Sequence, residues 1–533
     1  MNGVIGEDGG MARILVTEPL ADSGLALLRD AGHGVDVRLD LSPQDLLEAI
    51  SGAGALIVRS ATKVTEQVIE AGRDLVAVGR AGAGVDNIDV AAATRRGVMV
   101  VNAPGSNSLS TAEHAMALLL AMARNVPQAH GALKDGRWEK SRWAGVELHG
   151  KTLGVLGLGR IGTLVAQRAH AFGMRVIARD PFVTADRARQ LGIELVDSYE
   201  ELIAHSDFLS IHANKTKETT GLIGKDLLAK AKPGLRIVNA ARGGIVDEDA
   251  LAAAIETGQI AGAALDVFDT EPTTESPLFG LDSVVVTPHL AASTAEAQDK
   301  AGQMIAEQLV LALRGDFVPF AVNVEAAEVP ESVRPFLPLA ERLGRLFALL
   351  ADGLPPLMEI AYQGELAGHD TRLLKLAVLR GVLAAASDDP VSYVNAPQLA
   401  EEHGMQVRES TTTVSDEYVN LVSLSGGDHA LAGTLTGKRG DARIVMLDGH
   451  DIEIPLADHL LVVRNDDRVG MMALVTATVA EAGVNIADMR LGRSPGGGTA
   501  LAVITSDNEI PSSLRDRLAG HPGILDVLVV NAG

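Results

Sequence analysis

The sequence predicts an α/β protein of three or four domains, and three observations support this fold class. The chain has 533 residues, more than a single domain usually holds. Short apolar runs alternate with helical patterns over residues 12–314, as in parallel sheets whose strands are connected by helices. From residue 460 onward the pattern becomes strand, helix, strand, strand, helix, strand, which is the order of a ferredoxin-like unit.

Composition limits the possible functions. Aromatic residues make up 3% of a chain that is 47% hydrophobic, so the core must consist mainly of Ala, Val, Leu and Ile. The net charge of −23 argues against nucleic acid or an anionic membrane as a partner. The lack of cysteine excludes disulfides and thiolate metal ligands, and we expect no metal site. No signal peptide is recognisable, so we expect a cytoplasmic protein with a disordered extension at residues 1–10.

The first unit should be a small sheet of parallel strands. The expected strands are residues 12–16, 35–38, 55–58, 75–79 and 98–102, with helices at 25–32 and 43–51. Ser110 and Glu113 have the spacing of a capping box and predict the start of a buried helix over residues 111–124. An Ala-rich helix over residues 295–314 can return the chain to the first unit, so the segment between them would be an insertion.

The inserted segment carries a glycine pattern typical of dinucleotide binding. Residues 152–156 form an apolar strand, and Gly157, Gly159 and Gly162 follow it with the spacing G-x-G-x-x-G. The first glycine permits a tight turn, the second lets a pyrophosphate approach the backbone, and the third lets the next helix pack closely on the strand. The N-terminus of that helix offers free N–H groups to the phosphates.

The same pattern indicates which dinucleotide is bound. A second strand over residues 175–178 leads to Asp180, whose carboxylate can bond both hydroxyls of an adenosine ribose. That carboxylate would repel the 2′-phosphate of NADP, so we predict NAD as the cofactor. Arg179 should point to the opposite face because side chains alternate along a strand.

Three ionisable residues follow successive strands of the inserted segment. Strands are expected at residues 208–212, 236–240, 263–268 and 284–287. Arg242, Glu271 and His289 come after the last three, and ligands of such sheets bind beyond the carboxyl ends of the strands. We therefore expect one shared site for hydride transfer.

Each of these residue types suits a step of that chemistry. His289 can accept the hydroxyl proton near neutral pH, and Glu271 can hold its imidazole. Arg242 can bind a substrate carboxylate bidentately, and Asp266 could contact the nicotinamide amide.

The last third of the chain has a different pattern. The composition changes near residues 324–330, which we interpret as a linker, and residues 334–455 mix helices and strands without a chemical motif. The final unit should have strands at residues 460–463, 486–491, 500–505 and 524–530, and helices at 471–482 and 511–519. Such a unit could bind a small ligand or serve only in oligomerisation.

The segments around the three ionisable residues resemble a known family. NAARGGIVDEDAL, DVFDTEP and TPHLAAST are similar to the D-isomer-specific 2-hydroxyacid dehydrogenases, and the resemblance extends from residue 12 to about 323. The segments VRSATKVT, GRAGAGVDNID, VNAPGSNSLSTAEH, GRWEKSRWAG and YVNAPQLAEEHG look like those of its long members. Those members carry an intervening domain and a terminal ACT domain.

The resemblance implies a domain plan. A Rossmann-type NAD-binding domain (109–295) would be inserted in a flavodoxin-like substrate-binding domain (12–108 and 296–324). An α+β intervening domain (325–456) and a ferredoxin-like ACT domain (459–533) would follow.

The resemblance also implies ligands and their residues. The substrate would be 3-phosphoglycerate, the effector L-serine at Asp467 and Asn485, and the assembly a dimer or tetramer. The residues implied to bind substrate are Arg59, Arg80, Gly82, Ala83, Asn102 and, from a partner subunit, Lys140. Those implied to bind NAD are Gly157, Gly159, Arg160, Ile161, Gly162, Asp180, Ala213, Ala240, Arg242, Asp266, His289 and Ala292.

Some positions depart from the family pattern, and two other functions stay open. Ala291 and Ala292 follow TPHL where the family usually has glycine first, and Arg464 and Val469 replace the usual His and Pro of the ACT loop. One alternative is a glyoxylate or hydroxypyruvate reductase, against which the two arginines and the long C-terminal extension argue. The other is an NAD-sensing corepressor, against which the ACT-type tail argues.

Overall fold

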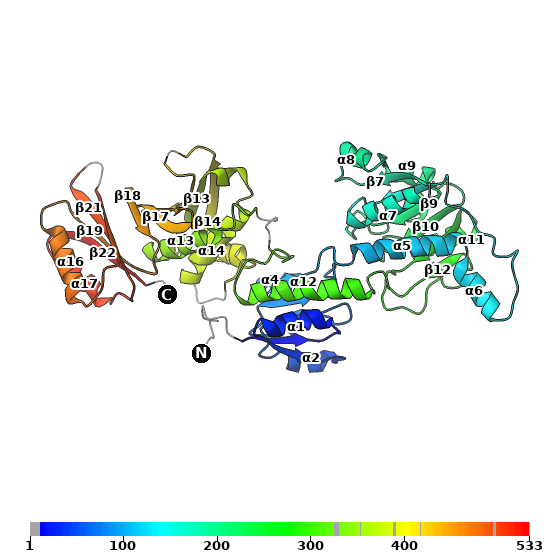
Figure 1. Cartoon of the computed structure of the whole chain (residues 1–533), viewed down its shortest axis with the longest axis horizontal. Helices are drawn as coiled ribbons and strands as arrows, with labels where there is room; N and C mark the ends of the chain where they lie inside the picture. Colours follow the sequence, from blue (N-terminus) through cyan, green and yellow to red (C-terminus); the bar gives the residue numbers. More distant parts are fainter. Residues whose placement is uncertain are drawn as a thin grey trace.

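The computed structural model describes residues 11–324, 330–351, 353–386, 391–415, 417–493 and 497–531. These residues form four β-sheets with their helices, which follow one another along the long axis of the molecule (Figure 1). The expected extension at residues 1–10 and the residues 325–329 of the expected linker lie outside the described part. The predicted α/β fold class is confirmed.

The first sheet has five parallel strands in the order β2-β1-β3-β4-β5, which is the flavodoxin-like order. Its strands are β1 (Arg13–Val16), β2 (Gly34–Val37), β3 (Ala55–Val58), β4 (Ala77–Arg80) and β5 (Met99–Val101). Its helices are α1 (Asp22–Asp30), α2 (Pro43–Ala49), α3 (Glu66–Ala71), α4 (Val90–Arg95) and α12 (Ala295–Leu313). Apolar residues of α1 and α12 share one core with the sheet, so the Ala-rich helix does return the chain to this unit.

The second sheet has seven parallel strands in the order β12-β11-β10-β9-β6-β7-β8, the order of a doubly wound dinucleotide-binding fold with one added strand. Its strands are β6 (Thr152–Leu156), β7 (Arg175–Arg179), β8 (Glu194–Leu195), β9 (Phe208–Ile211), β10 (Leu235–Asn239), β11 (Ile260–Leu265) and β12 (Val284–Val286). Its helices are α7 (Arg160–Ala171), α8 (Ala185–Gln190), α9 (Tyr199–His205), α10 (Lys225–Leu228) and α11 (Glu248–Glu256).

The long apolar helix starts earlier than predicted. It is α5 (Ser108–Ala123), and its N-cap is Asn107, whose side chain makes no capping bond. The predicted capping box is therefore wrong, because Ser110 already lies in the first turn and its hydroxyl contacts Thr294 Oγ1 at 2.8 Å. Glu113 instead pairs with Arg168 on α7 at 3.5 Å. The helix is buried against the second sheet, as its composition predicted.

The contact between Ser110 and Thr294 has a topological meaning. The chain leaves the first sheet through the start of α5 and returns to it through the start of α12. Each hydroxyl belongs to one of the two chain crossings, the segments that connect the two sheets, so the two crossings lie side by side. They connect the two sheets at one place.

The third and fourth sheets form the other end of the molecule (Figure 1). The third is mixed, in the order β14-β13-β15-β16-β17-β18. Its elements are α13 (Phe336–Leu350), β13 (Leu357–Gly364), η1 (Glu365–Gly368), α14 (Arg372–Ala386), α15 (Ala396–Glu402), β14 (Gln406–Thr412), β15 (Asn420–Gly426), β16 (His429–Thr436), β17 (Asp441–Leu447) and β18 (His450–Pro455).

The fourth sheet is antiparallel, in the order β20-β21-β19-β22. Its elements are β19 (His459–Asp466), α16 (Met471–Glu481), β20 (Asp488–Arg493), β21 (Thr499–Ser506), α17 (Ser513–Ala519) and β22 (Ile524–Asn531). The predicted βαββαβ order is thus confirmed, and residues of this sheet share a core with α13 and α14.

One segment connects the third unit to the first. Val394 is buried in the core of the first sheet, and Asn395 lies against Gly97 at the end of α4. Arg380 donates to the carbonyl of Gly315 at 3.1 Å, just beyond α12. Among the described residues, no helix combines the length and the apolar character needed to cross a bilayer.

Candidate active site

The glycine turn between β6 and α7 has the geometry that a pyrophosphate requires. Gly157 has a φ of +90°, a conformation that side chains disfavour. A Cβ added to Gly162 would collide with the carbonyl of Gly157, so this glycine permits the close approach of helix and turn. A Cβ added to Gly159 would meet nothing within 4 Å, because this residue faces open space. Gly159 is the N-cap of α7 and leaves the first N–H groups of the helix without a side-chain cap.

Asp180 lies beside this turn. Its carboxylate accepts hydrogen bonds from the backbone N–H groups of Leu158 at 2.7 Å and Phe182 at 2.8 Å. These bonds hold the carboxylate next to the glycine turn, and its expected role in binding the ribose of NAD stays a prediction. The guanidinium of Arg179 instead lies 5.7 Å from the ring centre of Tyr199, on the other side of the strand.

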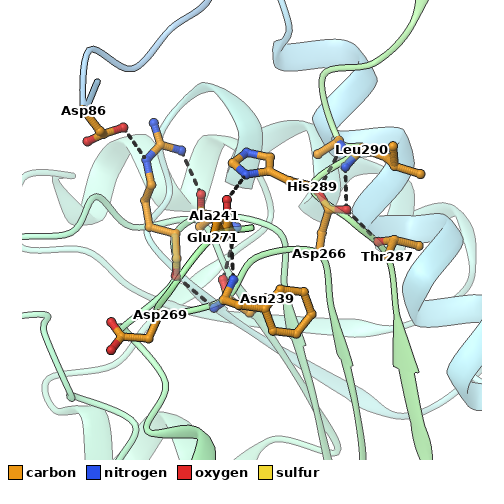
Figure 2. Close-up of polar contacts among 12 residues, drawn as sticks. Asp86, Asn239, Ala241, Asp266, Asp269, Glu271, Thr287, His289 and Leu290 are labelled. Atoms are coloured by element: carbon orange, nitrogen blue, oxygen red, sulfur yellow. Dashed lines mark hydrogen bonds and ion pairs between the residues drawn. The ribbon is translucent and has the colours of Figure 1, made fainter. Parts of the chain in front are cut away.

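His289 and Glu271 form a hydrogen-bonded pair beyond the carboxyl end of the second sheet (Figure 2). The distance from His289 Nδ1 to Glu271 Oε2 is 2.6 Å, and Glu271 Oε1 accepts from the N–H of Phe268 at 2.8 Å. The hydrogen bond from Glu271 raises the pKa of His289, although partial burial opposes it. Burial alone would raise the pKa of Glu271, but the bonds from His289 and Phe268 outweigh it and lower that pKa.

Asp266 holds the backbone on which His289 stands. Its side chain is fully buried and accepts hydrogen bonds from the N–H groups of Leu290 at 2.7 Å and Ala291 at 2.9 Å. It also contacts Thr287 Oγ1 at 2.6 Å and His114 Nε2 at 3.1 Å. His289 itself has a φ of +54°, which is uncommon for a residue with a side chain. Asp266 thus stabilises an unusual turn, and its expected contact with the nicotinamide amide stays a prediction.

Replacing Glu271 by glutamine should move the pH dependence of catalysis. His289 must be neutral to accept a proton, so oxidation rates rise as pH passes upward through its pKa. Because Glu271 raises that pKa, Glu271→Gln should shift the rise in kcat/KM for oxidation to lower pH and reduce the plateau rate. Initial rates measured across a pH series for both proteins test this, and an unchanged midpoint would contradict the assignment.

Arg242 reaches from the second sheet toward the first. Its Nη1 donates to the carbonyl of Ala241 at 2.8 Å, and its Nε lies 3.6 Å from Asp86 Oδ2, which belongs to the loop after β4 (Figure 2). Asn239 fixes the turn by donating to the carbonyl of Arg242 at 3.0 Å. The positive charge of Arg242 lowers the pKa of His289.

The two predicted phosphate-binding arginines, Arg59 and Arg80, belong to the first unit, and the charges of Arg59 and Arg242 both act on Arg80. Arg80 ends β4 and is half-buried, and its Nη1 donates to the carbonyl of Gly84. A Cβ on Gly84 would lie 2.6 Å from Arg242 Nη2 and 3.5 Å from Arg80 Nη1, so this glycine separates the two guanidinium groups. Arg59 follows β3 directly. Its backbone N–H and carbonyl groups are hydrogen-bonded to side chains of the same unit.

The remaining predicted residues occupy varied positions. Asn102 donates to the carbonyl of Ala83 at 2.6 Å and so shapes the loop expected to line the substrate. Ala291 is buried in the core with α5, which accommodates the methyl group that replaces the family's glycine. Ala240 is buried and Ala213 half-buried at the ends of β10 and β9, and Lys140 is exposed. The role of Lys140 in a partner subunit stays a prediction.

The two predicted effector residues lie at opposite ends of the fourth sheet. Asp467 follows β19, whose Asp466 pairs with Thr499, whereas Asn485 precedes β20, whose first residue pairs with Thr505 at the other end of β21. Asp467 pairs with Arg493 at 3.4 Å, and Asn485 is exposed in the turn after α16. Arg464, which replaces the family's histidine, pairs with Asp448 of the third unit at 3.1 Å. This departure therefore stabilises the contact between the last two units.

The sequence reasoning missed four residues that contact predicted site residues: Glu18, Asp86, Asn87 and His114. Asp86, Asn87 and His114 lie inside the motifs GRAGAGVDNID and VNAPGSNSLSTAEH that carried the resemblance. They could have been found by asking what orients the arginines and the histidine, since functional side chains need partners that fix their rotamers.

Comparison with known proteins identifies the segments. Family models match the D-isomer specific 2-hydroxyacid dehydrogenase NAD binding domain over residues 116–291, the D-3-phosphoglycerate dehydrogenase intervening domain over 332–448 and the ACT domain over 459–523. Among solved structures, NAD+-bound 3-phosphoglycerate dehydrogenase of Entamoeba histolytica is 30% identical, with a TM-score of 0.50, and covers 59% of this chain and 99% of its own. Fold and site together define a dehydrogenase of the D-2-hydroxy acid class.

Relatives that match nearly the whole chain indicate which family within this class of dehydrogenases the chain belongs to. D-3-phosphoglycerate dehydrogenase of Mycobacterium leprae is 46% identical over 97% of this chain and 99% of its own length. The protein of that name from Methanocaldococcus jannaschii is 41% identical over 98% of this chain and 100% of its own length. The chain belongs to the D-3-phosphoglycerate dehydrogenase family, which confirms the resemblance seen in the sequence.

Proposed function

We propose that the protein oxidises 3-phosphoglycerate to 3-phosphohydroxypyruvate with NAD, as the first step of L-serine synthesis. The observation that carries this proposal is the convergence of Arg80 and Arg242 on Gly84, next to the His289–Glu271 pair. In a chain with a net charge of −23, guanidinium groups from two sheets suit a substrate with two anionic ends. The names and lengths of the relatives support the same substrate.

The residues divide the chemistry among them. Arg242 binds the substrate carboxylate and polarises the oxygen on C2, while Arg59 and Arg80 bind the phosphate. His289 takes the hydroxyl proton at Nε2, since its Nδ1 is held by Glu271, and the carboxylate stabilises the imidazolium that forms. NAD, when bound, accepts the hydrogen and electron pair that leave C2. Gly157, Gly159, Gly162 and Asp180 hold its pyrophosphate and ribose.

The direct test measures the formation of NADH from NAD and 3-phosphoglycerate, which is monitored by its absorbance. The proposal expects a higher kcat/KM for this substrate than for D-glycerate, and a higher rate with NAD than with NADP. Faster reduction of glyoxylate or hydroxypyruvate than of 3-phosphohydroxypyruvate would favour a reductase of unphosphorylated acids instead.

We also propose the domain division given by the resemblance, a cytoplasmic location and a dimer or tetramer. Separate apolar cores for the first and second sheets support the insertion of residues 109–295 between 12–108 and 296–324. Exposed apolar side chains gather on and after α6 (Val126–Lys134), where Val126, Leu133 and Trp138 are 55%, 57% and 81% exposed. They support an interface through which Lys140 would reach a partner's substrate.

L-serine is the expected effector. The match to an ACT domain supports an amino-acid ligand. Because Asp467 and Asn485 lie at opposite ends of the fourth sheet, they would bind the amino and carboxylate ends of one ligand from two paired units, at the interface between subunits. Initial rates measured against serine concentration should show inhibition of the full chain, and Asn485→Ala should lose that response, each curve being normalised to its own rate without serine. A full chain that ignores serine up to millimolar levels would contradict this assignment.

A further inference from the structure

The loop that follows β3 is held by a carboxylate from the end of β1. Glu18 accepts hydrogen bonds from the backbone N–H groups of Arg59 at 2.7 Å, Ala61 at 3.1 Å and Thr62 at 2.9 Å. Burial alone would raise the pKa of Glu18, but these backbone donors outweigh it and lower that pKa. An ionised Glu18 therefore accepts the hydrogen bonds offered by the backbone N–H groups of the loop that carries Arg59.

Asn87 satisfies the carbonyl side of the same loop. Its Nδ2 donates to the carbonyl oxygens of Arg59 at 2.9 Å and Thr62 at 2.6 Å. Its Oδ1 accepts from Arg80 Nε at 2.8 Å. A guanidinium nitrogen can only donate and a carbonyl oxygen can only accept, so these partners fix the orientation of the amide.

Asn87 is thus joined to both arginines through one planar amide. One end fixes the backbone from which the Arg59 side chain projects, and the other fixes the guanidinium of Arg80. Arg80 is also held at Gly84, so its side chain is ordered before any ligand arrives. An arginine that is already ordered loses less conformational entropy when it binds an anion.

We propose that Asn87 is a positioning residue, which sets the spacing and direction of Arg59 and Arg80 for the substrate phosphate without touching the substrate. The inference rests on the proposed function, because it assigns the phosphate to these two arginines. It predicts that Asn87 determines the preference for phosphorylated over unphosphorylated D-2-hydroxy acids.

The test is a comparison of kinetics on 3-phosphoglycerate and D-glycerate. Asn87→Ala should raise KM for 3-phosphoglycerate about tenfold or more, the scale of a lost hydrogen bond to a charged group. For D-glycerate, kcat/KM should change about twofold or less, because this substrate has no phosphate for the arginines to bind. Asn87→Asp keeps an acceptor for Arg80 but sets a carboxylate oxygen against the two loop carbonyls, so it too should raise KM on the phosphorylated substrate only.

Asn323 provides a matched control in the same unit. Its Oδ1 accepts from the N–H of Val100 at 2.9 Å, and its Nδ2 donates to Val98 O at 3.0 Å and Thr94 Oγ1 at 3.1 Å. Asn323→Ala removes a comparable bridge away from the arginines. It should lower Tm without changing the ratio of kcat/KM between the two substrates.

Two outcomes would overturn the inference. One is an equal rise in KM for both substrates in Asn87→Ala, or in Asn87→Asp if the alanine variant does not fold. The other is a full additional loss when Asn87→Ala is added to Arg59→Ala and Arg80→Ala, because a residue that acts through the arginines adds nothing once they are gone. A wild type that does not oxidise 3-phosphoglycerate contradicts the proposed function itself, so the two failures are distinguishable.

Discussion

Replacement of His289 by alanine is expected to lower kcat by roughly 100-fold or more, the usual scale for a positioned general base. The imidazole is the titratable group that Glu271 holds at 2.6 Å beyond the strand ends, and alanine leaves the hydroxyl proton without an acceptor. The turn beneath it is bonded through Asp266 to the backbone of residues 290 and 291, so the loop should keep its shape. The loss should therefore fall on kcat.

Binding of NADH separates a chemical defect from a folding defect. Its fluorescence titration should give nearly the same Kd for His289→Ala and wild type, since the glycine turn and Asp180 lie elsewhere in the sheet. His205→Ala changes an exposed histidine on α9 of the same sheet and should leave turnover unaffected. Near-normal turnover in His289→Ala would remove this residue from the proton transfer.

Replacement of Arg59 by alanine is expected to lower kcat/KM for 3-phosphoglycerate by about 10- to 100-fold, as for a lost charged hydrogen bond. The same change should affect D-glycerate far less, because that substrate has no phosphate to bind. The backbone of Arg59 is held by Glu18 and Asn87, so the side chain can be removed without releasing the loop.

A surface arginine controls for the general effect of removing a positive charge. Arg73 is exposed in the same unit, and Arg73→Ala should change neither substrate's kinetics, since isolated surface charges are screened by salt. If Arg59→Ala reduced kcat/KM equally for both substrates, the phosphate assignment would be contradicted.

The sequence predicted those features that depend on local patterns. The strand runs, the glycine spacing and the placement of Arg242, Glu271 and His289 after successive strands all follow from periodicity and from the rule that ligands bind at carboxyl ends. The capping box failed because Ser110 fits the local pattern equally well as a residue of the first turn. Its contact with Thr294, 184 residues away, is a tertiary interaction that no local pattern contains.

Contacts between units could not be predicted from the sequence, for the same reason. The approach of Arg242 to Asp86 joins two sheets, and the pairing of Arg464 with Asp448 joins two others. Asn87 lay within a recognised motif, but its three partners come from separate strand ends and a loop. Only their placement in space shows that one amide serves both arginines.

The adjoining crossings at Ser110 and Thr294 make the link between the first two sheets a single pivot. Two crossings far apart would act as parallel struts and resist rotation, whereas two at one place leave an axis free. Turning about this axis would separate Arg242 from Asp86 while leaving the hydrogen bonds within both sheets unbroken. The third unit is anchored to the first through Val394, so it would move with the first sheet, and the second sheet would turn alone.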